Sequence, residues 1–364
     1  MKAHKVPATY FSGWKAVGYN ESFYTFYKNN LYDKGILKSF GDVRKITTEH
    51  SYFMAENFYY IDFNIKGIVF KLKDEIEDFL NESPYTIECV DHLKDISKDE
   101  PLPIVIIDNH KKFTSYMDNI GSWVIRDKQN KIISLNTFND RLNDYIFDSV
   151  GKIIEEDYFA YHLETMWGGV RASIISDTDG LNHGDEVTLT RKQDLLEFFV
   201  VQYLRLDKRI KTDIDPKLKI FEEAFIEMGI DKKTLSAMKN DGILTSDAYF
   251  YGVLLDAARG DKYVINNEIS KIDTNFVIDV LKAEPGYSFL SSTSPCIIID
   301  DKTEEMLFPL NSQYCLFFRK KKDGLICGQY KLQKDTNVKK INNIIVKNSE
   351  DIVVSELEYI NGIV

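Results

Sequence analysis

The chain has few glycines and none of the short motifs that mark several common enzyme classes. Its 19 glycines among 364 residues form no phosphate-binding loop, and neither a G-x-S-x-G turn nor an H-E-x-x-H motif occurs. The residue set of the protein kinases is also missing. These absences argue against P-loop nucleotide hydrolases, α/β-hydrolases, zinc proteases of the H-E-x-x-H type and kinases.

Cysteine and histidine are scarce as well. The four cysteines include no close pair, whereas structural zinc sites use closely spaced pairs. No two of the six histidines stand at the spacing of metal ligands on a helix. We therefore expect no metal ion and no cofactor, and we expect reduced, buried thiols at Cys89, Cys296, Cys315 and Cys327.

Long apolar runs are absent. No stretch approaches the ~18 consecutive apolar residues that cross a bilayer, and the first residues lack the apolar core of a signal peptide. Apolar residues still make up 44% of the chain, which is enough to build a core and excludes disorder for most of it. We expect a cytoplasmic protein without a membrane partner.

The net charge of −11 excludes a uniformly basic, nucleic-acid-coating protein, but the charge is uneven. Residues 71–101 carry four lysines against ten acidic residues, a local charge of −6. Residues 319–347 carry nine basic residues against two aspartates, a local charge of +7. Any site for a polyanion is therefore expected in the second segment.

Apolar residues alternate with polar ones toward both ends and recur at helical spacing in the middle. The alternation predicts strands over residues 22–27, 57–63, 104–107, 122–126, 131–135, 287–290, 296–299, 314–318, 324–332 and 352–354. A hairpin tip over 320–324 is expected to join two of them. Helices are predicted over residues 141–175, with a break near Gly151, 195–210, 216–260 and 337–348.

Strands, a helical block and strands again are typical of an α+β fold. We expect a mixed β-sheet that is built from N- and C-terminal strands and packs against the central helical block, within a single elaborate domain over residues 1–364. Thr190 and Gln193 are predicted to form a capping box before the helix over 195–210. That helix is apolar on nearly every side, so its polar residues need partners inside the protein: Glu197, Gln202 and Arg205.

Two further segments place polar groups beside apolar elements. His4 lies two residues before Val6-Pro7, and the proline holds that segment extended. Four hydroxyl residues, 291–294, precede Pro295, where they either satisfy strand-end amides or point into a cleft.

These residues carry a resemblance to a bacterial family, the domain of unknown function 4238. This chain resembles the family's pattern at several places along the sequence. They are the segments 4–11 and 56–59, Glu164, the residues Phe198, Gln202 and Arg205, the turn over 289–295 and the strand start over 308–310. The resemblance implies that residues 62–140 are an insertion, and it implies a bacterial protein linked to phage defence. Thr293 stands where the family usually has aspartate, which removes a carboxylate from the site.

Two functions remain open. The first is a defence-associated effector that hydrolyses nucleic acid, with His4 as base, Arg205 holding a phosphate or carboxylate, and further catalytic positions at Glu164, Ser292 and Thr293. The alternative is a binding or interaction protein in which these polar residues are structural. Its partner would be RNA, DNA or an acidic protein surface, and its binding residues are Gln202, Arg319, Lys320, Lys321 and Lys322.

Overall fold

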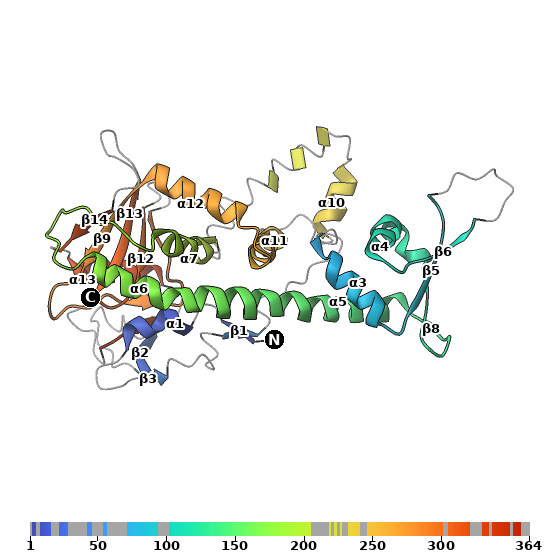
Figure 1. The fold of residues 1–364 in the computed structure, drawn as a ribbon, viewed down its shortest axis with the longest axis horizontal. Coiled ribbons are helices and arrows are strands. Elements are labelled where there is room, and N and C mark those ends of the chain that lie inside the picture. The colour runs from blue at the N-terminus through green and yellow to red at the C-terminus, as the bar shows by residue number, and fades with distance from the viewer. Residues whose placement is uncertain are drawn as a thin grey trace. The chain divides into compact units, whose positions relative to one another are not determined.

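The computed structural model divides the chain into two compact units, each described here by itself (Figure 1). Unit 1 comprises Met1, Tyr59–Ile154 and Ile214–Leu255, and unit 2 comprises Lys2–Phe58, Glu155–Asp213 and Asp256–Val364. The expected insertion over 62–140 falls within unit 1. The structure describes residues 2–4, 8–15, 22–27, 42–45, 54–56, 71–93, 102–204, 218–219, 222–223, 226–227, 232–240, 246–300, 305–320, 330–334, 337–349 and 352–357.

Unit 1 contains a four-stranded antiparallel sheet in the order β6-β5-β7-β8. Its strands are β5 (Thr86–Val90), β6 (Ile104–Ile106), β7 (Val124–Arg126) and β8 (Ile132–Ile133). Its helices are α3 (Lys73–Glu82), α4 (His110–Tyr116), η5 (Met117–Ser122), α5 (Leu135–Lys152), α10 (Lys232–Asn240) and most of α11 (Ser246–Ala258).

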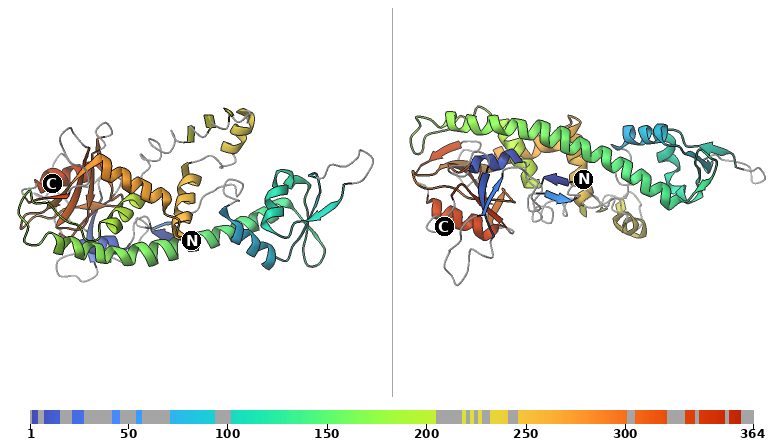
Figure 2. Two further views of the ribbon diagram at one scale, coloured as in Figure 1. Left: turned by 45° about the horizontal axis from the view of Figure 1, so that its top comes forward. Right: turned by 90° about the horizontal axis from the view of Figure 1, so that it is seen from below.

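The alternation of side chains along β5 decides which face of this sheet is buried. Ile87 and Cys89 are buried, whereas Glu88 between them is half-buried and Thr86 and Val90 at the two ends of the strand are exposed. Aromatic rings of α4 and α5 complete the core under the buried face, with Trp123 contacting both Phe113 and Phe138. Figure 2 shows α3, α4 and α5 on one side of the strands.

Unit 2 contains most of the described strands and the apolar helices α6 and α7. Its strands are β1 (Lys2–His4), β2 (Ser22–Tyr27), β3 (Asp42–Lys45), β4 (Met54–Glu56), β9 (Phe276–Lys282), β10 (Ser291–Ser292), β11 (Ile297–Asp300), β12 (Glu305–Pro309), β13 (Tyr314–Lys320), β14 (Tyr330–Gln333) and β15 (Ile352–Ser355). Its helices are α1 (Ala8–Phe11), η1 (Ser12–Trp14), η6 (Ile153–Glu164, whose first two residues belong to unit 1), α6 (Thr165–Asp177), α7 (Lys192–Leu204), α12 (Tyr263–Asn275) and α13 (Val338–Asn348).

The two larger sheets of unit 2 differ in the origin of their strands. The sheet β10-β15-β2-β3 joins N-terminal to C-terminal strands, as the sequence predicts, but it is antiparallel and not mixed. The sheet β11-β12-β13-β9-β14 is mixed, because β14 runs parallel to β9, and it uses C-terminal strands alone. The fold is therefore α+β, as expected.

Helix α7 lies against one face of the five-stranded sheet. All its side chains from Leu195 to Leu204 are buried. Phe199 stacks on Phe318 of β13 with ring centroids 4.3 Å apart, and Phe198 stacks on Trp167 of α6 at 4.1 Å. These stacked rings add specific geometry to the burial of apolar surface, so α6 and α7 form the helical layer that the sequence predicts.

Other expectations need correction. Thr190 does not cap α7, because its backbone N–H and its hydroxyl both donate to the carboxylate of Asp177, and the Gln193 amide bonds to Asn266. Residues 287–290 form no strand. β14 does not form a hairpin with β13, because β9, which the sequence reading missed, lies between them.

The helix predicted over 141–175 has no break near Gly151, because helical residues continue from α5 through η6 to α6. Other expectations are confirmed, and some lie outside the described residues. The strands over 22–27 and 352–354, the hairpin at 124–133 and the helix over 338–348 are present. Cys89, Cys296 and Cys315 are free and buried, and burial raises the pKa of each thiol. The segments 57–63, 205–210 and 324–329 and Cys327 fall outside the description. No helix within the described ranges is long and apolar enough to span a membrane.

Candidate functional site

The predicted catalytic residues lie on separate elements, and two of their side chains fall outside the description. His4 is the last residue of β1, and its backbone pairs with Met54 of β4. The structure does not describe the side chain of His4. It also does not describe Arg205, which follows Leu204, the last residue of α7. Glu164 is the last residue of η6 and is half-buried. The convergence of His4 and Arg205 on a cleft therefore stays a prediction.

The hydroxyl turn uses its side chains locally. The Ser292 hydroxyl donates to the carbonyl oxygen of Ser294, and the Ser294 N–H donates back to the Ser292 hydroxyl oxygen. Ser292 is buried, and Thr293 beside it is half-buried. The turn thus satisfies its own amides, as short hydroxyl side chains often do.

Several of the segments singled out in the sequence meet at Tyr10. Its ring lies 6.0 Å from that of Phe198 and 5.9 Å from that of Phe308, measured between centroids. Its hydroxyl lies 3.0 Å from that of Ser291 and donates to the Pro309 carbonyl. Tyr10 is fully buried, and burial raises the pKa of its phenol well above the ordinary value. The meeting point is a packed core and not an open cleft.

Gln202 also faces the interior of unit 2. It is 2% exposed, and its side-chain nitrogen has no hydrogen-bond partner in the described structure. A buried amide nitrogen of this kind usually finds a partner. Gln202 is thus placed apart from the surface on which a macromolecular partner would bind.

Glu197 has the partners that its place on an apolar helix requires. The Tyr158 hydroxyl donates to Oε1 at 3.1 Å, His162 Nε2 lies 2.9 Å from Oε1, and Lys262 Nζ lies 2.8 and 3.0 Å from the two oxygens. Burial alone would raise the pKa of Glu197, but the hydrogen bonds from His162 and Lys262 outweigh it and lower the pKa. Glu197 is therefore a carboxylate at neutral pH.

His162 contacts both charged residues of this group. Nε2 lies 2.9 Å from Glu197 Oε1 and also 2.9 Å from Lys262 Nζ. A carboxylate can only accept and an ammonium can only donate, so Nε2 donates to Glu197 in one tautomer of His162 and accepts from Lys262 in the other. The Glu197 cluster, defined as Tyr158, His162, Glu197 and Lys262, thereby ties η6 and α12 to α7.

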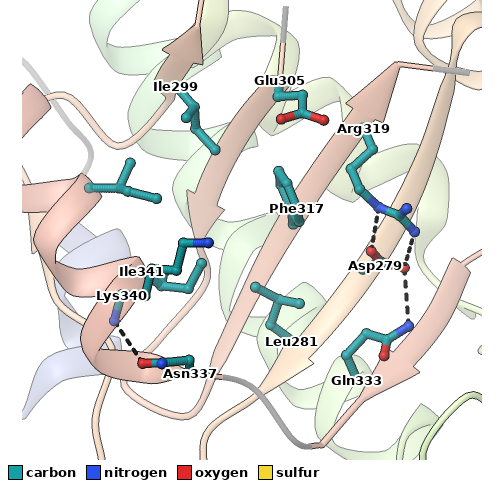
Figure 3. Close-up of a pocket in the computed structure, with 11 residues that line it drawn as sticks. Asp279, Leu281, Ile299, Glu305, Phe317, Arg319, Gln333, Asn337, Lys340 and Ile341 are labelled. Atoms are coloured by element: carbon teal, nitrogen blue, oxygen red, sulfur yellow. Dashed lines mark hydrogen bonds and ion pairs between the residues drawn. The ribbon is translucent and has the colours of Figure 1, made fainter. Parts of the chain in front are cut away.

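A groove lies on the face of the five-stranded sheet opposite α7, beside α13 (Figure 3). Its volume is about 600 Å³. Its floor and one wall are apolar, and it is lined by Leu281, Ile299, Phe317, Ile341 and Ile344 together with the polar residues Asp279, Glu305, Arg319, Gln333, Asn337 and Lys340. We call this surface the α13 groove.

A fixed ion pair forms one end of the α13 groove. Arg319 Nε and Nη2 donate to the two carboxylate oxygens of Asp279 at 2.7 and 3.0 Å, and the Gln333 amide donates to the same carboxylate at 3.3 Å. The paired, fork-like geometry fixes the guanidinium. Among the described contacts the Nη1 of Arg319 has no partner, so it is available to a ligand.

Lys340 is placed differently. It projects from the first turn of α13 over the groove (Figure 3). The side-chain oxygen of Asn337 caps this turn by accepting from the Lys340 N–H at 2.9 Å. Within the described residues no carboxylate forms an ion pair with the Lys340 ammonium. The groove therefore presents an uncompensated cation over an apolar floor.

Of the predicted binding residues, Arg319 lines this groove. Lys320 ends β13 and is exposed, and Lys321 and Lys322 lie outside the described residues. Sequence reasoning missed Asp279, although a charged residue within the run Phe276–Lys282 indicates a buried carboxylate in a strand that needs a partner.

Comparisons with known proteins add no relative. No family model, no curated protein and no solved structure matches this chain.

Proposed function

We propose that this chain is a binding protein, and that the α13 groove takes a small organic anion with an apolar body. The observation that carries the proposal is the Lys340 ammonium, unpaired among the described residues, above a floor that includes Phe317 and Leu281. A ligand's anionic group would pair with Lys340 and accept from Arg319, while its apolar part covers the floor.

The volume of the groove supports a ligand of limited size. About 600 Å³ falls within the range of roughly 300–1,000 Å³ that is usual for pockets holding drug-sized molecules. Its composition matches such pockets too, because apolar side chains dominate the lining and a few polar groups at the ends fix the orientation of a ligand.

The charge of the lining favours a small anion over RNA or DNA. Asp279 and Glu305 oppose Arg319 and Lys340, so the lining has no net formal charge. Nucleic-acid sites gain most of their affinity from several phosphate contacts with lysine and arginine. One unpaired lysine beside a neutralised arginine provides for a single charged group.

The test compares two adjacent lysines on α13. Both Lys339 and Lys340 are exposed, but only Lys340 lines the groove. The probe is anilinonaphthalene sulfonate, an aromatic anion whose fluorescence rises on binding. We expect Lys340→Glu to weaken its binding about tenfold, which corresponds to ~1.4 kcal/mol, and Lys339→Glu to change it less than about twofold.

Such a dye also binds other exposed apolar surface. The test therefore compares how much each of the two variants weakens the binding of the dye. Equal effects of Lys339→Glu and Lys340→Glu would show that the groove does not bind the anion. Binding that is insensitive to salt would also contradict a charge-assisted contact at the exposed Lys340.

A further inference from the structure

The outer face of the unit 1 sheet carries exposed apolar side chains along both edges. Large side chains stand on both of its edge strands, with Ile104 68% and Ile106 51% exposed on β6 and Ile132 62% exposed on β8. Val90 of β5, which pairs with Ile104, is 37% exposed. Exposed isoleucines gathered on one sheet face mark an interaction surface, whereas scattered ones carry no such meaning.

One polar pair lies in the middle of this face. Glu88 of β5 and Arg126 of β7 approach to 3.9 Å between the two central strands. Ile106 stands opposite Glu88 in the register, and Ile132 stands opposite Arg126. The face therefore consists of an apolar edge, a central pair of opposite charges and a second apolar edge, with no net charge in a chain that carries −11.

We propose that this face, the unit 1 outer face, binds the same face of a second copy of the chain. A twofold axis between two such faces, passing between Glu88 and Arg126, brings each Glu88 against Arg126 of the second copy. The same rotation brings the β6 side of one copy against the β8 side of the other, so that isoleucines meet isoleucines. A surface that complements itself in this way is what a twofold interface requires.

The chemistry of the face favours this occupant over a charged one. A nucleic acid or a strongly basic protein would bury four exposed apolar side chains against charged groups and gain a single ion pair. A second copy covers apolar surface with apolar surface and compensates both charges at the centre. Face-to-face packing of two sheets about 10 Å apart is a common arrangement.

The size of the face limits the affinity. Strands about 4.8 Å apart, with at most five residues at about 3.3 Å each, give a face about 17 Å on a side. The area of such a face, about 17 Å by 17 Å, is well below the ~800 Å² that each partner buries in stable complexes. We therefore expect a dimer that dissociates at concentrations of about 0.1–1 mM and not in the nanomolar range.

The first experiment measures the mass of the full chain by sedimentation equilibrium between about 20 µM and about 1 mM, a range that spans the expected dissociation constant. Ile106→Lys and Ile132→Lys should each keep the chain monomeric over this range. The matched control is Ile175→Lys, because Ile175 is 53% exposed but lies on α6 of unit 2. It should leave the dimer unchanged, and a circular dichroism spectrum checks that each variant is folded.

Charge reversal provides a readout that folding alone does not move. Glu88→Arg and Arg126→Glu should each weaken self-association, because each sets like charges against one another across the axis. An equal mixture of these two variants should associate more strongly than either alone. In the mixed dimer, the two positive side chains of one copy face the two negative side chains of the other. Inside a single chain no such rescue is available.

Three results overturn the proposal. If the wild-type chain stays monomeric up to about 1 mM, the face does not bind a second copy of the chain. Ile106→Lys with no more effect than Ile175→Lys places any dimer contact elsewhere. A mixture of the two charge variants that associates no better than either alone rules out the twofold arrangement.

Discussion

Replacing Glu197 with glutamine tests whether the Glu197 cluster holds the helices of unit 2 together. The substitution keeps the shape of the side chain but removes its charge. The new amide nitrogen can only donate, so wherever it points it faces one of the donors that now bond to the carboxylate: Tyr158, His162 and Lys262. At least one hydrogen bond is lost, and the Lys262 ammonium loses its counter-charge.

The magnitude follows from the burial of each partner. The Glu197 side chain is 7% exposed, against 27% for Lys262 and 37% for His162. Breaking a fully buried ion pair costs about 3–5 kcal/mol. Because water reaches Lys262 and His162, we expect Glu197→Gln to lower the free energy of unfolding by about 2–3 kcal/mol at pH 7.

The effect depends on pH in a definite direction. The pKa of Glu197 in the folded chain lies below the ordinary glutamate value of ~4.3. The carboxylate therefore stabilises the folded chain fully above that value, and this contribution is lost as the pH falls through the folded-state pKa. Glutamine does not titrate, so the gap in stability between wild type and variant should be widest near neutral pH and narrow below about pH 4.

Urea unfolding followed by tryptophan fluorescence at several pH values measures this gap. The control is Asp194→Asn on the same helix, because the two side chains of the Asp194–Arg191 ion pair are 34% and 39% exposed, far more than Glu197, so water screens the pair and it should be worth about 0.5 kcal/mol or less. A loss for Glu197→Gln no larger than that of the control, or a gap that does not change with pH, would refute the reasoning.

Two other sites of unit 2 give simpler tests by thermal unfolding. Tyr10→Phe keeps the ring but leaves the Pro309 carbonyl without its buried donor, and should cost about 1–2 kcal/mol. An unchanged melting temperature would contradict that hydrogen bond. Gly168→Ala meets no atom within 4 Å and should stabilise α6 by about 0.5–1 kcal/mol. Gly169→Ala places its methyl group on the guanidinium of Arg191 and should gain less, and the opposite order would contradict the close approach.

Elements whose stabilising contacts are local could be predicted from the sequence. The hairpin of β7 and β8 depends on the turn after Asp127, whose carboxylate accepts from the N–H groups of Gln129 and Lys131, with Asn130 at a positive φ of 63°. Helix α13 begins at Asn337, whose side chain caps its first turn. Both signals lie within a few residues of the element that they specify.

Elements whose hydrogen-bond partners are distant in the sequence could not be predicted from it. Thr190 has the local pattern of a helix cap, but Asp177 on the preceding helix takes its donors. The apolar run before Ser291 resembles a strand, yet its amides bond elsewhere, that of Phe289 to the carbonyl of Ser312 and that of Leu290 to the side chain of Asn342. In each case a long-range hydrogen bond overrides the local pattern.

In the candidate site, too, the residues could be predicted from the sequence but their distant partners could not. The sequence indicates that Glu197 needs a partner and that residues 319–347 form a basic surface. It does not show that Lys262 is the partner, 65 residues away, or that Asp279 neutralises Arg319 from a neighbouring strand. Those pairings depend on the register of β9 and β13 and on the packing of α12 against α7, which only the folded chain determines.

The pairing of β2 with β15 has a consequence for synthesis of the protein. Val353 and Val354 pair with Phe26 and Thr25, so this part of β2 waits for a partner strand that is made about 325 residues later. At about 5–20 residues per second, the ribosome needs roughly a quarter of a minute to a minute to supply it. Throughout that interval the aromatic strand β2 can pair with β3 but lacks β15, the neighbour on its other side. Nascent chains of this protein should therefore depend on chaperones more than chains whose sheets close between consecutive strands.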